Sequence, residues 1–221
     1  TEISYIGVAE RHTSGVFQNR VLCAVRTAIH RVGWLTFKRA GSIFTNPIDC
    51  PSGIVVAHLR GSGRSELMNI DLPTSLMRWS FGPARDLESA AALLHGLCAH
   101  LCAHGMDIRR ANMLVRTRQP QLEMLVYIWR PSDGDRVVVD TTQAVVGGRL
   151  DRYPGGEVET VLLATGHTDE ETWRCSPFYA CLEREAPIRR RLVDPTDPRD
   201  FPILADLERM GVTDYFVMPV K

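Results

Sequence analysis

The chain has 221 residues and a formal net charge of zero, with 44% hydrophobic and 24% charged residues. These proportions are those of a globular protein, and they exclude a wholly disordered chain or a collagen-like repeat. The apolar runs are interrupted well before the roughly 20 residues that a spanning helix needs, and no secretory signal is visible. The six cysteines form no CxxC pair and are too few for a disulfide scaffold. We therefore expect a cytoplasmic protein with no membrane contact.

The first predicted region, residues 1–76, is basic and irregular. Residues 1–67 contain 8 Lys and Arg against 4 Asp and Glu, whereas the remainder contains 18 against 22. Its apolar residues keep no helical or strand period for long. We interpret it as a poorly ordered segment or a spurious extension of the reading frame. Nucleic-acid binding is not favoured, because basic arms cluster Lys and Arg with aromatic residues, whereas these charges are scattered singly.

The second predicted region, residues 77–221, begins with a helix. The segment DLESAAALLHGLCAHLCAHG has Asp86 as the expected N-cap and Gly105 as the expected C-terminal stop. Its apolar residues recur at intervals of three and four, which is typical of a helix with one buried face. They are Leu87, Ala90, Ala91, Leu94, Leu97, Cys98 and Leu101.

Residues that favour strands dominate the next part of the chain. RANMLVRT and EMLVYIWR flank RQPQL, which predicts a hairpin. DRVVVDTT follows the turn PSDG and predicts a third strand. The pattern is weak from residue 143 to residue 171, where GGRLDRYPGGE predicts a loop and VETVLLAT a strand. We interpret this weak part as an insertion.

Clear signals of secondary structure are present again near the end of the chain. Ser176 and Pro177 predict the start of a helix, and APIRRRL predicts an extended stretch. A last helix is expected with Asp200 as its cap and Gly211 at its end. The final strand, from residue 215 to residue 220, is apolar on both faces. Such a strand needs cover on both faces and neighbours at both edges.

In this order, the elements predict an α+β domain with helices packed on an antiparallel sheet. SPFY, RRRL and FPILADLERMGVTDYFVMPV, following the first helix and hairpin, resemble the GAF-like regulatory domain at the N-terminus of bacterial class III adenylate and guanylate cyclases. The resemblance covers residues 77–221. In that family a further hairpin partner, a closing helix and the cyclase catalytic domain follow the last strand. The resemblance therefore implies that this strand is incomplete at its edge and that its missing partner lies beyond Lys221.

The resemblance implies a sensory or regulatory module of cyclic-nucleotide signalling. Such a module binds a small-molecule ligand or a partner, passes a packing change to a downstream catalytic domain, and commonly forms a homodimer. Two alternatives remain open: a fragment of an adenylate cyclase, and a stand-alone small-molecule or nucleic-acid binding protein. Salt-sensitive binding to DNA is the observation that would favour the last of these.

Neither catalytic residues nor a cofactor are predicted. A class III cyclase needs two aspartates that hold two metal ions, and neither NPIDC nor VVVDTT provides the expected strand and Gly-Phe turn. His95, Cys98 and Cys102 share one helix face, and imidazole and thiolate are ligands for zinc or iron. The competing interpretation, which we prefer, is that Cys98 is a small buried residue and that the histidine is satisfied locally.

Two further groups are candidate ligand-binding residues. Arg189, Arg190 and Arg191, beside Arg184, have the charge to bind a phosphate-bearing ligand. A solvated edge paired with neighbours such as Glu183 and Glu185 is the alternative for this run. The aromatic residues Tyr127, Trp129 and Phe178 are the second group: they line a small-molecule pocket in one interpretation and belong to the plain core in the other.

Overall fold

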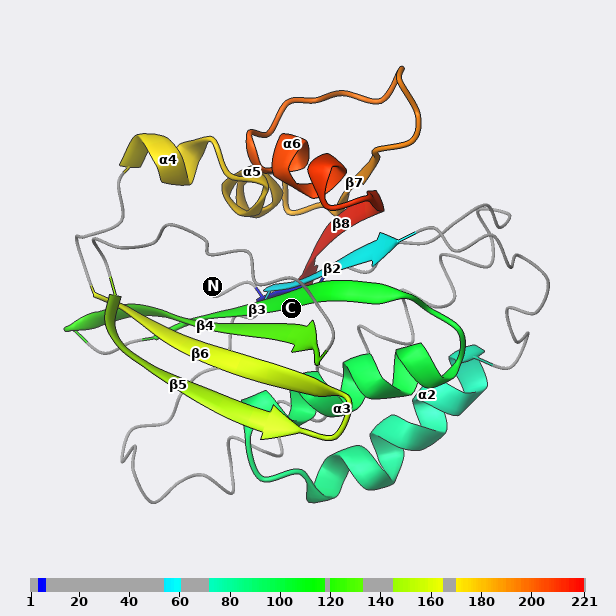
Figure 1. The fold of residues 1–221 in the computed structure, drawn as a ribbon. Coiled ribbons are helices and arrows are strands. Elements are labelled where there is room, and N and C mark those ends of the chain that lie inside the picture. The colour runs from blue at the N-terminus through cyan, green and yellow to red at the C-terminus, as the bar shows by residue number, and fades with distance from the viewer. Residues whose placement is uncertain are drawn as a thin grey trace.

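The fold is known from a computed structural model that describes residues 4–6, 54–60, 72–117, 120–132, 145–164 and 170–220. Its centre is an eight-stranded sheet with the order β5-β6-β4-β3-β2-β1-β8-β7 (Figure 1). The strands are β1 (Ser4–Ile6), β2 (Ile54–Arg60), β3 (Ile108–Arg116), β4 (Leu122–Pro131), β5 (Val145–Tyr153), β6 (Gly156–Ala164), β7 (Ile188–Arg191) and β8 (Val212–Val220). All described pairings are antiparallel except the short contact between β1 and β2. The predicted α+β class is confirmed.

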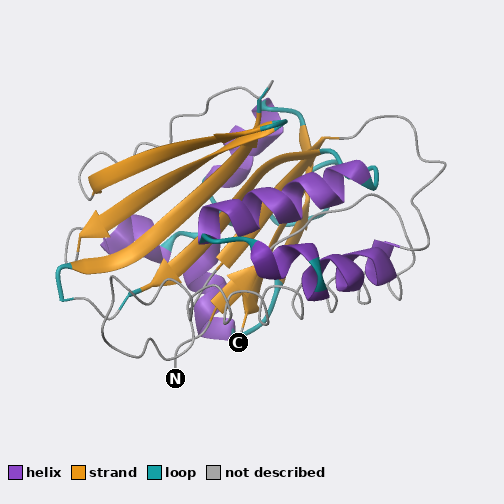
Figure 2. Ribbon diagram, turned by 90° about the horizontal axis from the view of Figure 1, so that it is seen from below, coloured by secondary structure: helices purple, strands orange, loops and turns teal. Residues whose placement is uncertain are grey.

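Helices cover both faces of this sheet. They are α2 (Leu72–Phe81), the 3-10 helix η1 (Pro83–Asp86), α3 (Ala90–Ala103), α4 (Glu170–Arg174), α5 (Pro177–Arg184) and α6 (Ile203–Arg209). Figure 2 shows α2 and α3 lying across one face, and Figure 1 shows α4, α5 and α6 on the other side. No helix in the described ranges is long and apolar enough to cross a membrane.

Each face of the sheet has its own buried cluster. The first, which we call the α3 core, joins buried side chains of α2 and α3 to one face of β3, β4, β6 and β8. The second, the α6 core, joins α5 and α6 to the opposite face of β3, β4, β7 and β8. Because successive strand residues point to opposite faces, neighbouring residues of β8 divide between the two: Phe216 lies in the α3 core and Val217 in the α6 core.

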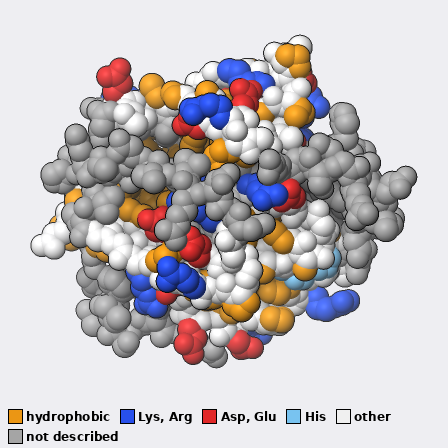
Figure 3. All heavy atoms as spheres, in the orientation of Figure 1, with side chains coloured by type: hydrophobic (Ala, Val, Ile, Leu, Met, Phe, Trp, Pro, Cys, Tyr) orange, Lys and Arg blue, Asp and Glu red, His pale blue; other side chains and the backbone are white. Residues whose placement is uncertain are grey.

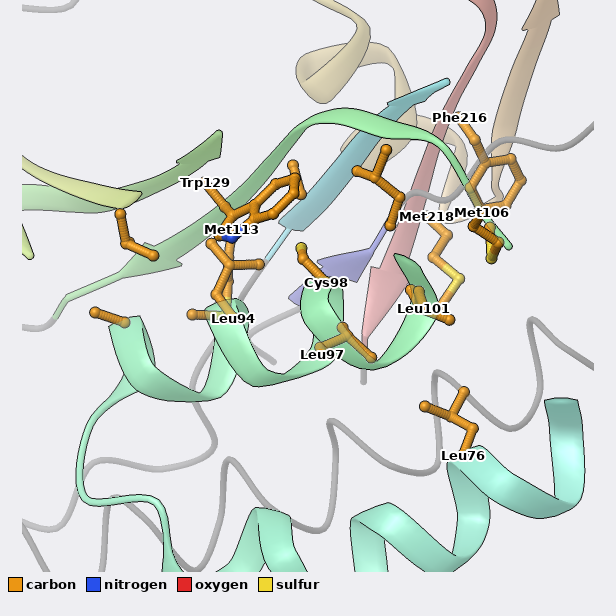
Figure 4. Close-up of a cluster of buried hydrophobic side chains, with 14 of the residues drawn as sticks. Leu76, Leu94, Leu97, Cys98, Leu101, Met106, Met113, Trp129, Phe216 and Met218 are labelled. Carbon is orange, nitrogen blue, oxygen red and sulfur yellow. The ribbon is translucent and has the colours of Figure 1, made fainter. Parts of the chain in front are cut away.

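The helix α3 has the predicted buried face and C-terminal end but a different N-cap. Leu94, Leu97, Cys98 and Leu101 are each 1% exposed, and Figure 4 shows Leu94 and Cys98 pointing from α3 toward the sheet, whereas Leu97 points toward α2. Gly105 has φ 89°, a left-handed conformation that glycine adopts without strain. The expected cap at Asp86 is wrong. Asp86 ends η1 instead, and α3 begins after Ser89, whose hydroxyl accepts a hydrogen bond from the Ala92 amide at 3.1 Å.

Of the two N-caps predicted for the later helices, the one for α5 is confirmed and the one for α6 is wrong. Ser176 caps α5, since its Oγ accepts from the Tyr179 amide at 3.1 Å, as predicted. Asp200 does not cap α6, which begins after Pro202. The carboxylate of Asp200 instead accepts a hydrogen bond from Arg190 Nε at 2.8 Å. Asp200 therefore pairs with Arg190 of β7, a contact that only the tertiary fold creates, and does not cap the helix.

The predicted hairpin of β3 and β4 is confirmed, with Ala111 opposite Trp129 and Arg116 opposite Met124. The strand predicted from VETVLLAT is confirmed as part of β6. The loop expected from GGRLDRYPGGE is wrong, because β5 runs through it and pairs with β6. Pro154 and Gly155 form the connecting turn, in which the φ of 83° at Gly155 suits a type II turn. The strand expected from DRVVVDTT lies outside the described residues.

The expectation that the last strand lacks a partner is wrong. On one edge β8 pairs with β7, where Val217 lies opposite Ile188. On the other edge it pairs with β1 and β2, where Tyr5 lies opposite Pro219 and Arg60 opposite Val212. Residues 212–219 are all buried, which confirms the prediction of cover on both faces. The partners β1 and β2 were missed because they lie in a segment whose local pattern is weak, and β7 was predicted only as an extended stretch, since strand pairing is not encoded locally.

The predicted division of the chain after residue 76 falls inside α2, which runs from Leu72 to Phe81. Within the first 76 residues, β1 and β2 are part of the central sheet. Most of this segment lies outside the described residues, so the interpretation of it as a poorly ordered or spurious extension stays a prediction.

Candidate functional site

A chain of three aromatic rings joins the sheet to α3. Trp129, on β4, is 2% exposed, and its Nε1 donates a hydrogen bond to Nδ1 of His95 on α3 at 3.2 Å. The ring of His95 stacks on Tyr153 of β5, with centroids 4.5 Å apart and an interplanar angle of 11°. Figure 4 shows Trp129 between the sheet and α3, above Leu94. The Trp129 indole is therefore tied to α3 through His95, whose ring stacks in turn on β5.

The same tryptophan borders an open depression of about 500 Å³. The depression lies where the end of α3, the start of β3, the end of β4 and the turn between β5 and β6 meet. Its lining residues are Ala99, Cys102, Gly105, Met106, Asp107, Ile108, Arg109, Trp129, Pro131, Pro154 and Gly155. Concave, mostly apolar sites with a few polar groups are the usual form of small-molecule sites, and here Asp107 and Arg109 supply the polar groups.

An irregularity in β3 places Arg109 beside this depression. Leu59 pairs with Ile108 and His58 pairs with Arg110, so Arg109 is an extra residue without a partner on β2. This is a β-bulge, which changes the direction of a side chain relative to the regular alternation. Ile108 and Arg109, although consecutive, both line the depression. Arg109 Nε lies 3.0 Å from Asp107 Oδ1.

The structure separates the three aromatic candidates. Tyr127 and Trp129 pack with the α3 core, whereas Phe178 of α5 packs with the α6 core on the opposite face of the sheet. Of the three, Trp129 lines the depression. Burial raises the pKa of Tyr127, as expected for a phenol that has lost its water. One pocket formed by all three residues is therefore not present, and the ligand role of each stays a prediction.

The three candidate metal ligands on α3 have three different surroundings. His95 receives the Trp129 hydrogen bond, Cys98 is 1% exposed in the α3 core, and Cys102 faces the depression. Burial raises the pKa of the Cys98 thiol well above its usual value, which disfavours the thiolate that binds metals. Among the residues that the structure describes, no group of three or more His, Cys, Asp or Glu side chains is placed to hold a metal ion.

We expect His95 to make stability depend on pH. Burial lowers the pKa of His95 below its ordinary value of 6.5, and its Nδ1 must stay unprotonated to accept the Trp129 hydrogen bond. The unfolded chain therefore binds a proton more readily than the folded chain. The free energy of unfolding should fall as the pH is lowered from about 7 to about 5, and His95 should contribute no pH dependence above about 8.

Urea denaturation at a series of pH values measures this effect. In His95→Gln, whose amide accepts a hydrogen bond without titrating, the fall should be shallower than in the wild type. Part of it should remain, because burial and the neighbouring His104 also lower the pKa of His100. Equal slopes in the two proteins would contradict the prediction.

The arginine run on β7 is paired within the chain. Arg189 Nη2 lies 2.7 Å from the buried carboxylate of Asp214, and Arg191 Nη2 lies 3.0 Å from Asp194. Arg190, which binds Asp200, also lies over the Phe201 ring at 5.4 Å. Aspartates thus supply the ion pairs described for these three arginines. Figure 3 shows acidic side chains beside the basic ones on this part of the described surface. Phosphate binding by these arginines stays a prediction.

Sequence reasoning missed a second charged group, inside the sheet. Arg110 and Asn112 on β3 and Arg130 on β4 are 4%, 5% and 8% exposed. Arginine is almost never buried to this degree unless it is paired, and Arg130 Nη1 forms an ion pair with Glu159 of β6 at 3.0 Å. The sequence carries no clear signal for them, because the same strand contains Arg109 and Arg116, which are not buried.

Comparison of the chain with protein-family models, with curated proteins and with solved structures found no match.

Proposed function

We propose that the chain is a non-catalytic, GAF-like sensory or regulatory module of a bacterial cyclic-nucleotide signalling protein. It acts in the cytoplasm, binds a small molecule, and passes the resulting change in packing to an adenylate or guanylate cyclase domain. The α+β arrangement supports this proposal, because the depression lies where the sheet meets the end of α3. The motifs SPFY, RRRL and FPILADLERMGVTDYFVMPV support the family assignment.

One observation carries the binding part of the proposal. Trp129 is at once a wall of the depression and a hydrogen-bond donor to His95 of α3. A ligand that presses on the indole changes the hydrogen bond to α3 and the stacking of His95 on Tyr153. Binding at the surface is thereby connected to the packing of a helix that spans one face of the sheet. A regulatory module needs such a connection between ligand contacts and an element that can shift.

The test of binding is a thermal-shift screen of the purified chain against cyclic AMP, cyclic GMP, ATP, GTP and a panel of small aromatic and aliphatic compounds. We expect at least one compound to raise Tm in a saturable way. Cys102→Phe fills the depression and should weaken that compound at least tenfold. Cys175→Phe is the matched control, since Cys175 is another exposed cysteine and does not line the depression; it should bind as the wild type does.

Absence of a saturable shift with every compound, or equal binding by Cys102→Phe and the wild type, would contradict the ligand site. The non-catalytic part of the proposal has a separate test. Incubation with ATP or GTP and Mg²⁺ or Mn²⁺ should give no cyclic nucleotide above background, and clear product formation would defeat it. Homodimer formation, which we also propose, is measured by sedimentation velocity.

A further inference from the structure

Two histidines lie side by side near the C-terminal end of α3. His100 and His104 are separated by one helical turn, which puts them on the same side of the helix. Their ring centroids are 4.4 Å apart, with an interplanar angle of 41°. Both residues are partly exposed, and Figure 3 shows histidine side chains at the surface on the side of the molecule where α2 and α3 lie. Neither residue lines the Trp129 depression.

A hydrogen bond determines which nitrogen of His104 carries the proton. Its Nδ1 lies 2.8 Å from the carbonyl oxygen of His100, one of the last carbonyls of α3. A carbonyl oxygen only accepts, so neutral His104 carries its proton on Nδ1 and its lone pair on Nε2. Histidines that bind metal ions commonly donate their other ring N–H to a backbone carbonyl or a carboxylate. His104 is therefore already in the tautomer that a metal ligand needs.

His100 is held by the neighbouring helix α2. Its Nε2 lies 3.3 Å from Ser75 Oγ, and its ring stacks on Trp79 with centroids 5.6 Å apart. The serine hydroxyl can donate or accept, so His100 offers its lone pair at Nε2 in one tautomer and at Nδ1 in the other. Burial and the neighbouring His104 lower the pKa of His100. The ring is therefore neutral at pH 7, and it does not have to lose a proton before it binds a metal ion.

We propose that His100 and His104 bind a divalent transition-metal ion of the zinc, nickel and copper group. Imidazole nitrogen is a good ligand for these ions, whereas Mg²⁺ and Ca²⁺ prefer oxygen. The same spacing of histidines supplies ligands in the helical zinc motif H-E-x-x-H. Two imidazoles that share one ion at about 2.1 Å have ring centroids roughly 5 Å apart. The observed separation of 4.4 Å is close to this value.

The surroundings of the pair determine what kind of metal site it is. Among the residues that the structure describes, no third His, Cys, Asp or Glu completes a cluster with the two histidines. Water therefore fills the remaining coordination positions, and the ion exchanges with solution, unlike the ion of a closed structural zinc site. Because His100 contacts Ser75 and Trp79, a bound ion also stabilises the packing of α2 against α3. The site does not depend on the function proposed for the depression.

Isothermal titration of the full chain, prepared without a histidine tag, tests the proposal. The chain is titrated at pH 7 with Ni²⁺ and Zn²⁺, and with Mg²⁺ as the blank. We expect saturable binding of Ni²⁺ and Zn²⁺ and none of Mg²⁺. If neither Ni²⁺ nor Zn²⁺ binds above the Mg²⁺ blank, the proposal is overturned.

Two variants, His100→Gln and His104→Gln, test the location of the site. Glutamine can keep a hydrogen bond at either position, but it has no imidazole nitrogen to offer the ion. Each variant should weaken Ni²⁺ binding by about tenfold or more, since losing even a partner of a metal ligand costs roughly 10–100-fold. His95→Gln is the matched control, because it removes a histidine from another face of α3, and it should bind Ni²⁺ as the wild type does. Unchanged Ni²⁺ affinity in either variant, or an equal loss in the control, would overturn the proposal.

Discussion

Replacing Gly156 with alanine is expected to lower the free energy of unfolding by about 3 kcal/mol. A Cβ atom at this position of β6 would lie 2.6 Å from Trp129 Nε1 and 3.0 Å from the carbonyl oxygen of Arg130. The backbone oxygen is held in the sheet, so the indole has to move and its hydrogen bond to His95 is lost. Overpacking of this kind costs about 1–3 kcal/mol and a lost hydrogen bond about 1 kcal/mol.

The measurement is urea denaturation followed by circular dichroism, together with the tryptophan emission spectrum of the folded protein. Gly147→Ala is the matched control, because a Cβ atom there would lie 3.7 Å from Leu162 Cδ1, an ordinary contact. The control should change stability by less than about 0.5 kcal/mol. Equal stability of Gly156→Ala and Gly147→Ala would show that the indole is not held as described.

Replacing Phe216 with alanine is expected to cost about 3–5 kcal/mol, the usual range for a buried phenylalanine. Phe216 lies on β8 and is 4% exposed in the α3 core. Figure 4 shows its ring beside Met106, at the end of the cluster that α3 covers. The result depends on β8 being an interior strand with partners on both edges. A last strand that lacked its partner would fray, and truncation of its side chains would then cost little.

Val193→Ala is the control for this prediction. Val193 is 66% exposed in the segment after β7, so its truncation should change stability by less than about 0.5 kcal/mol. Both variants are compared with the wild type by urea denaturation, with the m-value checked for two-state behaviour. A cost below about 1 kcal/mol for Phe216→Ala would contradict the placement of β8.

The parts of the fold that sequence reasoning predicted are those determined by near neighbours. The buried face of α3 follows from a period of three and four, and its end follows from Gly105. The hairpin of β3 and β4 follows from two runs of strand-forming residues around a turn. In β5, by contrast, Gly147 and Gly148 have weak strand propensity, and pairing with β6 overrides it.

The contrast between local pattern and tertiary fold also explains which candidate site residues could be predicted. Trp129 was a candidate pocket residue, and it does line the depression. Its grouping with Phe178 fails because the sheet separates the two, and which face a helix covers is a property of the tertiary fold. Arg110 was not a candidate, since a single arginine in a strand carries no sign of burial. Arg110 is buried, at 4% exposure, because other strands of the sheet lie on both sides of β3 in the tertiary fold.

The order of the sheet also sets when the protein can fold. The strand β8 closes the sheet by pairing with β1 and β2, which come from the opposite end of the sequence. Strand pairs between distant segments form slowly, because the entropy of closing a long loop is lost before the stabilising contacts form. During synthesis the edge of β2 that β8 covers therefore stays unpaired until β8 has left the ribosome, and an unpaired strand edge can pair with another chain and aggregate.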